Sequence, residues 1–142
     1  MTMHRRPLGR GRRLAGVFAL ITLVGCVLPW WTLGGTDGLP PLSGNAFEAV
    51  GILVFLSAMA TLALVSLPFA SERPLGLDRW PAYLIAFGIG LLGFVLRLGG
   101  LIGDGHLESI RPDHAPGLVL VAIGLIGLGR AVFEIHEQPE PR

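Results

Sequence analysis

The chain has 142 residues, of which 51% are hydrophobic and only 15% are charged, whereas soluble domains carry about 25% charged residues. A polar share this small cannot cover the surface of a globular domain, so the composition predicts a protein that is solvated by lipid. All 11 lysine-plus-arginine residues are arginine, and the formal net charge is +1. The single cysteine, Cys26, excludes a disulfide, a CxxC redox pair and a cysteine-based metal site within the chain.

Four apolar stretches predict four membrane helices, at residues 14–33, 46–69, 81–102 and 116–133. Each is close to the ~20 residues that a helix needs to cross the hydrocarbon core, and backbone groups in lipid must be satisfied within the segment. Short connections favour antiparallel neighbours. The sequence therefore predicts an all-α fold, an integral membrane four-helix bundle of up-down-up-down topology. This single domain at 14–133 lies between a basic cytoplasmic arm at 1–13 and a polar cytoplasmic tail at 134–142.

The stretch LVGCVLPWWTLGG at 23–35 has two interpretations. The residues LVGC at 23–26 fit the box that directs lipid onto a cysteine, and cleavage before Cys26 would remove residues 1–25. Alternatively the first helix is retained, with Cys26 as a compact apolar residue and the two tryptophans at the lipid boundary. The apolar run continues past the cysteine to nearly a full span, which favours the retained helix.

Polar residues mark the predicted starts of the later helices. Asn45, with Glu48 three residues further on, resembles a capping box before the second helix. Asp78 and Asp113 each precede a proline by three residues. An acidic N-cap followed by a proline in the first turn is typical of a helix start, so both are predicted to cap their helices.

The arginines predict the orientation of the bundle. Nine of them share one side of an even-numbered bundle, namely Arg5, Arg6, Arg10, Arg12, Arg13, Arg73, Arg79, Arg130 and Arg142. By the positive-inside rule both termini are cytoplasmic, in a multi-pass protein of the plasma (inner) membrane. The basic arm is predicted to contact anionic membrane lipids rather than nucleic acid. Aromatic residues at the two boundaries are expected to act as interface anchors, namely Trp30, Trp31, Trp80 and Tyr83.

Small residues recur at helical spacing on the third and fourth helices, namely Gly90, Gly93, Gly117, Gly124, Gly127 and Ala131. In lipid, close contact between helices requires such residues. They either pack the helices of one chain together or form a stripe for a second copy or another membrane protein. Because four helices of one chain must be packed, contacts inside the monomer are the favoured interpretation.

Two charged residues are candidates for an intramembrane site. Arg97 lies inside the third apolar stretch, and Glu48 enters the second at a similar depth from the outer side. Charges in a membrane usually find partners, so an Arg97–Glu48 ion pair is expected. It would serve as a gate or as a site for an anionic headgroup or substrate. The alternatives are that Arg97 snorkels outward and that Glu48 only caps its helix.

The outer loop DGHLESIRPDH contains weak candidates for metal ligands, namely Asp104, His106, Glu108 and His114, with Asp113 beside them. Histidine and carboxylate are ordinary ligands of zinc and copper. Their spacing matches no established signature, so a solvated polar loop is the favoured interpretation.

No enzymatic constellation is visible in the sequence. A Ser-His-Asp set, a phosphate loop and a CxxC pair are all lacking, and no predicted helix carries a histidine that would bind haem. The sequence thus predicts a protein without enzymatic activity or a cofactor. Three functions are open: an accessory or scaffold subunit acting by helix–helix association, a minimal transporter or channel using Arg97 and Glu48, and an outer-loop metal-binding or sensing protein.

Two short motifs carry a resemblance to a known group of proteins. Leu28-Pro29-Trp30-Trp31, and then the SGNAF run at 43–47 before a long apolar helix, are similar to small uncharacterised membrane proteins of actinobacteria. This resemblance covers roughly the first half of the chain. It implies four helices in a plasma membrane, without an established activity and without a functional residue that is carried over. Apart from membrane lipids, the partners expected from the sequence are a second copy of the chain or a larger membrane protein.

Overall fold

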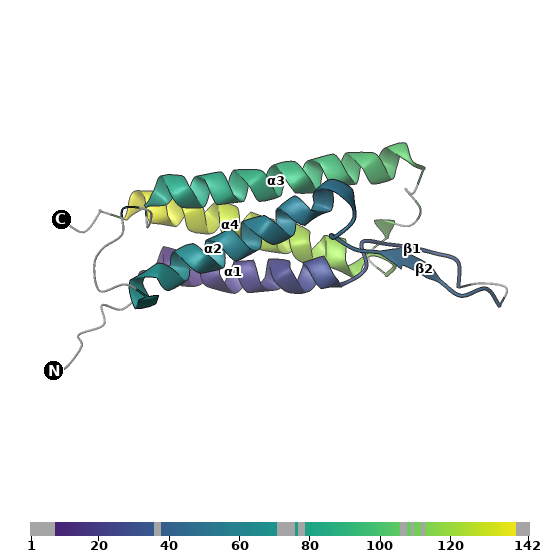
Figure 1. Ribbon diagram of the computed structural model, residues 1–142, viewed down its shortest axis with the longest axis horizontal. Coiled ribbons are helices and arrows are strands. Elements are labelled where there is room, and N and C mark those ends of the chain that lie inside the picture. The colour runs from purple at the N-terminus through teal and green to yellow at the C-terminus, as the bar shows by residue number, and fades with distance from the viewer. Residues whose placement is uncertain are drawn as a thin grey trace.

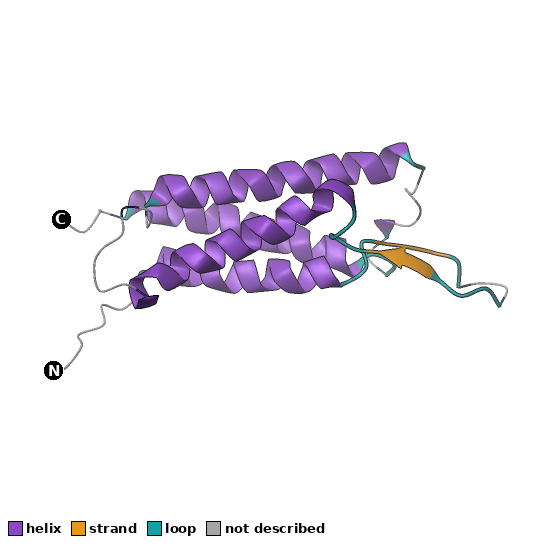
Figure 2. Ribbon diagram, viewed as in Figure 1, coloured by secondary structure: helices purple, strands orange, loops and turns teal. Residues whose placement is uncertain are grey.

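The computed structural model describes residues 8–35, 38–70, 76, 79–105, 108, 110–111 and 113–138. Over these residues, four α-helices lie side by side and a two-stranded hairpin projects from one end of the bundle (Figures 1 and 2). The helices are α1 (Arg10–Val27), α2 (Ile52–Ala70), α3 (Trp80–Gly103) and α4 (Pro116–Glu137), with the 3-10 turn η1 (Ala49–Gly51) before α2. The predicted all-α class is confirmed, and the hairpin of β1 (Trp31–Leu33) and β2 (Leu42–Gly44) is an addition to it.

The helices form a ring in which each packs against its neighbours in the chain and α1 closes against α4. The pair α1–α4 has the most extensive contact, and the pair α3–α4 has the least of the four. The end that carries the start of α1 and the end of α4 is called here the arginine end, for Arg10, Arg12, Arg13, Arg79 and Arg130. The opposite end, from which β1 and β2 project, is called the hairpin end (Figure 1).

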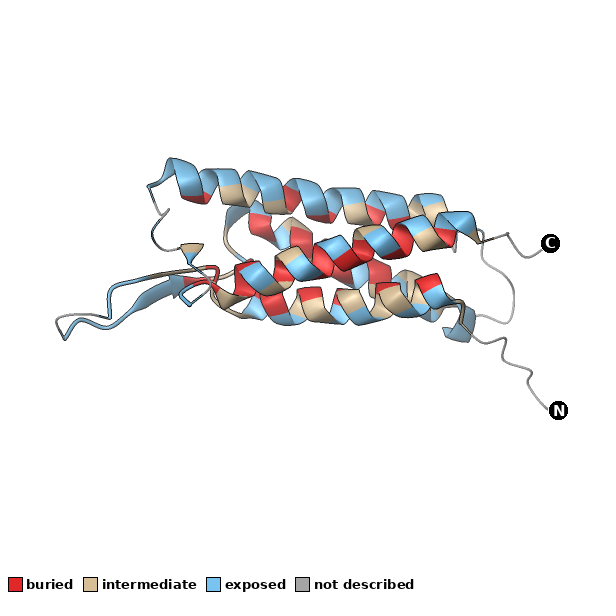
Figure 3. Ribbon diagram, turned by 180° about the vertical axis from the view of Figure 1, so that it is seen from behind, coloured by how far each residue is buried: buried red, intermediate tan, exposed pale blue. Residues whose placement is uncertain are grey.

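Buried strips run along the helices on the sides that face the bundle interior (Figure 3), and the strip on α1 consists of small residues. On α1 the buried face includes Ala15, Ala19, Thr22 and Cys26. A Cβ added to Gly124 would meet Thr22 Oγ1, and one added to Gly127 would meet the Phe18 ring. Helices α1 and α4 therefore approach closely because these two positions of α4 are glycines, which have no side chain.

All six small residues that the sequence singles out lie in contacts inside the monomer. Gly90 lies against Ser57 and Gly93 against Leu53, while Gly117, Gly124, Gly127 and Ala131 are buried on α4. The Ser57 hydroxyl also donates a hydrogen bond of 2.5 Å to the Ala86 carbonyl oxygen, joining α2 to α3. The favoured interpretation of these residues, packing within one chain, agrees with this arrangement.

The predicted first helix at 14–33 is wrong at both ends, since α1 runs from Arg10 to Val27. Pro29 ends it, because a proline disfavours helical geometry in the preceding residue, and Leu28 is extended with φ −74° and ψ 156°. Trp30 and Trp31 therefore lie outside the helix, and Trp31 begins a strand instead. The predicted loop at 34–44 contains β2 at its end.

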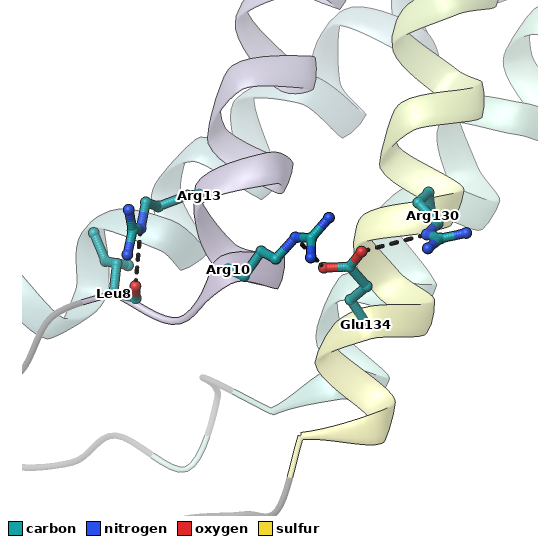
Figure 4. A network of polar contacts seen from close by, with 5 residues as sticks. All are labelled: Leu8, Arg10, Arg13, Arg130 and Glu134. Atoms are coloured by element: carbon teal, nitrogen blue, oxygen red, sulfur yellow. Dashed lines mark hydrogen bonds and ion pairs between the residues drawn. The ribbon is translucent and has the colours of Figure 1, made fainter.

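Residues 10–13 of the predicted basic arm and 134–137 of the predicted polar tail are helical and belong to α1 and α4. At the arginine end the Glu134 carboxylate forms ion pairs with Arg10 Nε at 3.6 Å and with Arg130 Nε at 3.3 Å (Figure 4). Nearby, Arg13 Nε donates a hydrogen bond to the Leu8 carbonyl oxygen. These contacts extend α1 and α4 by about a turn each beyond their apolar segments. Residues 1–7 and 139–142 lie outside the described residues.

The third predicted helix differs from α3 by one residue at each end. The predicted caps differ more. Ala115, not Asp113, is the N-cap of α4, and Arg79 is that of α3, while Asp78 lies outside the described residues. Glu48 precedes η1 instead of closing a capping box, and the Asn45 Oδ1 accepts the Phe47 backbone N–H as a local turn.

Within the described part of the chain, three helical segments are long and apolar enough to cross a membrane, namely Ala49–Ala70, Trp80–Gly103 and Pro116–Glu137. In contrast, α1 has 18 residues, and three of its first four are arginine. Its remaining apolar part is about 14 residues, or about 21 Å long at 1.5 Å per residue. The extended residues after Val27 continue this segment toward the hairpin end.

Candidate functional site

The charged pair suggested by the sequence lies in contact at the hairpin end. Arg97 Nη2 donates to Glu48 Oε2 at 2.6 Å, and the indole Nε1 of Trp31 donates to the same oxygen at 3.0 Å. The Arg97 side chain is 12% exposed, whereas that of Glu48 is 44% exposed. These three residues, called here the Glu48 cluster, join β1, the turn before α2, and α3.

The hairpin brings Trp31 to Glu48 because Trp31 pairs with Gly44 in the antiparallel ladder. A Cβ on Gly44 would collide with the Trp31 indole nitrogen and with both carboxylate oxygens of Glu48. Directly after Glu48, Ala49 has a positive φ of 49°, a conformation that costs a residue with a Cβ about 1 kcal/mol or more. The chain thus holds a strained turn at the point where it aims Glu48 at the cluster.

Trp30 plugs the hairpin end of the bundle, with none of its surface exposed. Its indole Nε1 donates to the Gly25 carbonyl oxygen at 2.9 Å, and its ring meets Phe94 edge to face at 5.9 Å between centroids. Its backbone N–H donates to the Gly44 carbonyl oxygen. The expectation of a lipid-boundary anchor at Trp30 does not agree with this buried position.

The last turn of α1 and the extended backbone after it have hydrogen-bond partners from two directions. The Gly117 N–H donates to the Pro29 carbonyl oxygen at 2.9 Å, and the Ala46 N–H donates to the Cys26 carbonyl oxygen at 3.3 Å. Non-helical backbone that is buried away from water requires such partners. The two motifs LPWW and SGNAF therefore meet in space and together build the hairpin end.

A cavity of about 140 Å³ opens beside the cluster, lined by Val27, Pro29, Ser43, Gly44, Asn45 and Glu48. The buried Nε of Arg97 has no hydrogen-bond partner among the described residues. Because Arg97 already neutralises Glu48, the cluster has little net charge to offer a charged ligand, and its clearest physical role is to fasten the hairpin to α3.

The other candidate residues are spread over the two ends. Trp80 is half-buried and meets His136 edge to face at 4.6 Å, whereas Tyr83 is buried in the core rather than exposed at a boundary. Cys26 is fully buried on the α1 face that meets α4.

The metal candidates of the loop between α3 and α4 are only partly described. Asp104, Glu108 and His114 are exposed, and His106 lies outside the described residues. Among the residues that the structure describes, no group of three or more His, Cys, Asp or Glu lies close enough to hold a metal ion. The backbone carbonyl of His114 accepts a hydrogen bond of 2.8 Å from the Thr32 hydroxyl, which ties this loop to β1.

The sequence did not point to Trp31 as a partner of Glu48, or to Gly44 as the residue that makes room for both. Trp31-Thr32-Leu33 is rich in residues that favour strands, and this was the local signal for a hairpin. Comparisons of the chain with protein-family models, with curated proteins and with solved structures gave no match. The resemblance of the LPWW and SGNAF motifs therefore stays a prediction.

Proposed function

We propose that this chain is a multi-pass plasma-membrane protein that crosses the bilayer four times and acts as an accessory subunit by helix–helix association. Three apolar helices of membrane-spanning length support the placement in lipid. Among the described residues the arginine end carries five arginines, and only Arg97 and Arg111 lie toward the hairpin end. By the positive-inside rule the arginine end faces the cytoplasm and the hairpin faces outward.

The place of α1 in the bundle supports its retention in the mature protein. A Cβ on Gly25 would come within 2.9 Å of the Val121 backbone nitrogen, so the chain around the LVGC box is packed directly on α4. Cleavage before Cys26 would remove the helix that makes the most extensive contact with α4. We therefore favour the uncleaved helix over the lipoprotein.

The observation that carries the association proposal is a face of α3 that points away from the bundle. Gly88, Leu92, Val95, Gly99 and Gly103 recur on it at intervals of three or four residues, and all five are exposed. A Cβ at any of its three glycines would meet open space. Gly99 and Gly103 are four apart, a spacing that lets another membrane helix approach closely. This outer α3 face fits a helix of a second copy or of a larger membrane protein.

Transport through the bundle has weaker support. The buried polar side chains of the described core are Thr22, Ser57 and Thr61, and each of their hydroxyls donates to a backbone carbonyl oxygen. They offer no continuous polar path between the two ends. The Glu48 cluster, the motivation for a transporter, fastens the hairpin without opening toward such a path.

Substitution on the outer α3 face tests the proposal. Gly99→Leu is expected to abolish recovery of a stoichiometric partner, or of a second copy, in native-detergent pulldown with mass spectrometry, because a large side chain blocks close approach. Gly100→Leu is the matched control: Gly100 is adjacent, exposed and also surrounded by open space, but it lies about 100° away on the helix. A wild-type chain that runs as a solitary monomer, or equal loss in both variants, would contradict the proposal.

A further inference from the structure

A groove of about 260 Å³ lies between α3 and α4 near the arginine end. Trp80, Leu84 and Phe87 form one wall, and Val132 and Phe133 belong to the other. Here α4 carries Gly129, whose added Cβ would lie 3.2 Å from the Phe87 ring. The groove exists because Gly129 leaves α4 without a side chain opposite Phe87. It lies between α3 and α4, the pair of neighbouring helices with the least contact.

The size and walls of the groove select among hydrophobic occupants. A second α-helix, about 10 Å across with its side chains, is too wide for a space of this volume. An acyl chain is narrow, flexible and wholly apolar, and the aromatic and aliphatic walls match it. Acyl chains surround this surface of the bundle once it lies in a bilayer.

The mouth of the groove is polar and basic. His136 is exposed in the last turn of α4 and meets the Trp80 ring, and exposed Arg79 directly precedes Trp80 at the start of α3. Over the described residues, five arginines at this end face two glutamates, Glu134 and Glu137. Glu134 is already engaged by Arg10 and Arg130 (Figure 4), so it does not neutralise Arg79.

We propose that this groove binds one anionic phospholipid of the cytoplasmic leaflet, with an acyl chain between Phe87 and Phe133 and the phosphate at Arg79 and His136. Basic residues at a cytoplasmic helix end attract anionic headgroups, and the groove below them adds a site for the chain of the same molecule. The inference rests on the membrane placement proposed above, but it does not depend on association through the outer α3 face.

Native mass spectrometry of the full chain in detergent tests the site, with phosphatidylglycerol and phosphatidylcholine of identical chains as the two probes. The wild type is expected to retain phosphatidylglycerol preferentially. Arg79→Gln is expected to lower this preference about fivefold, since one cation near a headgroup contributes on that scale. Arg111→Gln, which removes an exposed arginine toward the hairpin end, is the matched control and is expected to change nothing.

Gly129→Leu fills the groove and is expected to cause a loss of retention of both lipids, because its side chain takes the place of the acyl chain opposite Phe87. If Gly129→Leu lowers the melting temperature, the lipid site is tested with Arg79→Gln and His136→Gln instead. Both positions are exposed, so these two substitutions are expected to leave the fold intact. Equal retention of the two lipids by the wild type, or retention unaffected by Gly129→Leu, overturns the inference. So does release of a protein partner, instead of lipid, by Gly129→Leu. Gly99→Leu is expected to keep lipid selectivity, so that a failure of the association proposal can be told apart from a failure of the lipid site. Recovery of the wild type in the soluble fraction would overturn the membrane placement itself.

Discussion

Gly117→Val is expected to lower the free energy of unfolding by about 3 kcal/mol, the upper range for overpacking a core. A Cβ at Gly117 would lie 2.5 Å from the Leu28 carbonyl oxygen and 2.6 Å from that of Gly25. Both are backbone atoms, which cannot turn aside as a side chain does. The same residue donates its N–H to the Pro29 carbonyl oxygen, so displacement of α4 would also break that bond. Thermal unfolding in detergent measures the effect.

Gly100→Val is the matched control for this substitution. A Cβ at Gly100 meets nothing within 4 Å, and valine has a higher helix propensity than glycine. The control is expected to melt at or slightly above the wild-type temperature. Equal melting temperatures for Gly117→Val and Gly100→Val would contradict the close packing of the chain after α1 on α4.

Glu48→Gln is expected to destabilise the protein by about 2 kcal/mol. Glutamine still offers an oxygen to the Trp31 indole, but the Arg97 guanidinium, only 12% exposed, loses its counter-charge. Breaking a fully buried ion pair costs about 3–5 kcal/mol. The effect expected here is smaller, because the Glu48 side chain is 44% exposed. Combining Glu48→Gln with Arg97→Leu is expected to cost less than the sum of the two changes.

The Arg10–Glu134 salt bridge at the arginine end provides the control for this double-mutant cycle of Glu48 and Arg97. Arg10 and Glu134 lie 3.6 Å apart, but the Arg10 side chain is 80% exposed. Arg10→Gln is therefore expected to change stability by less than about 0.5 kcal/mol. A coupling energy near zero between Glu48 and Arg97 would show that the cluster does not fasten the hairpin to α3.

Much of the bundle follows from local patterns in the sequence. The run of α3 is uninterrupted apart from Arg97 and carries Pro81 in its first turn, so its bounds are nearly unambiguous. The small residues of α4 recur at helical spacing, and that spacing places them on one face whatever they contact. Charge placement alone also put Arg97 and Glu48 at similar depth.

The hairpin end could not be predicted in the same way. An apolar run such as CVLPWW is compatible with a helix or with an extended segment, and periodicity does not separate the two. The outcome depends on contacts with distant residues: Trp31 pairs with Gly44, and Pro29 accepts from Gly117. For the same reason a lipid-boundary position for Trp30 was the natural expectation, although its ring closes the core against Phe94.

Cysteine labelling in intact cells tests the central claim, a membrane bundle with the hairpin outside and the arginine end in the cytoplasm. In a Cys26→Ala background, which removes the single native thiol, Ser43→Cys is placed on β2 and Gly76→Cys between α2 and α3, both at exposed positions. A membrane-impermeant maleimide is expected to label Ser43→Cys in intact cells and Gly76→Cys only after permeabilisation. Labelling of both without permeabilisation, or the reverse pattern, would contradict the account.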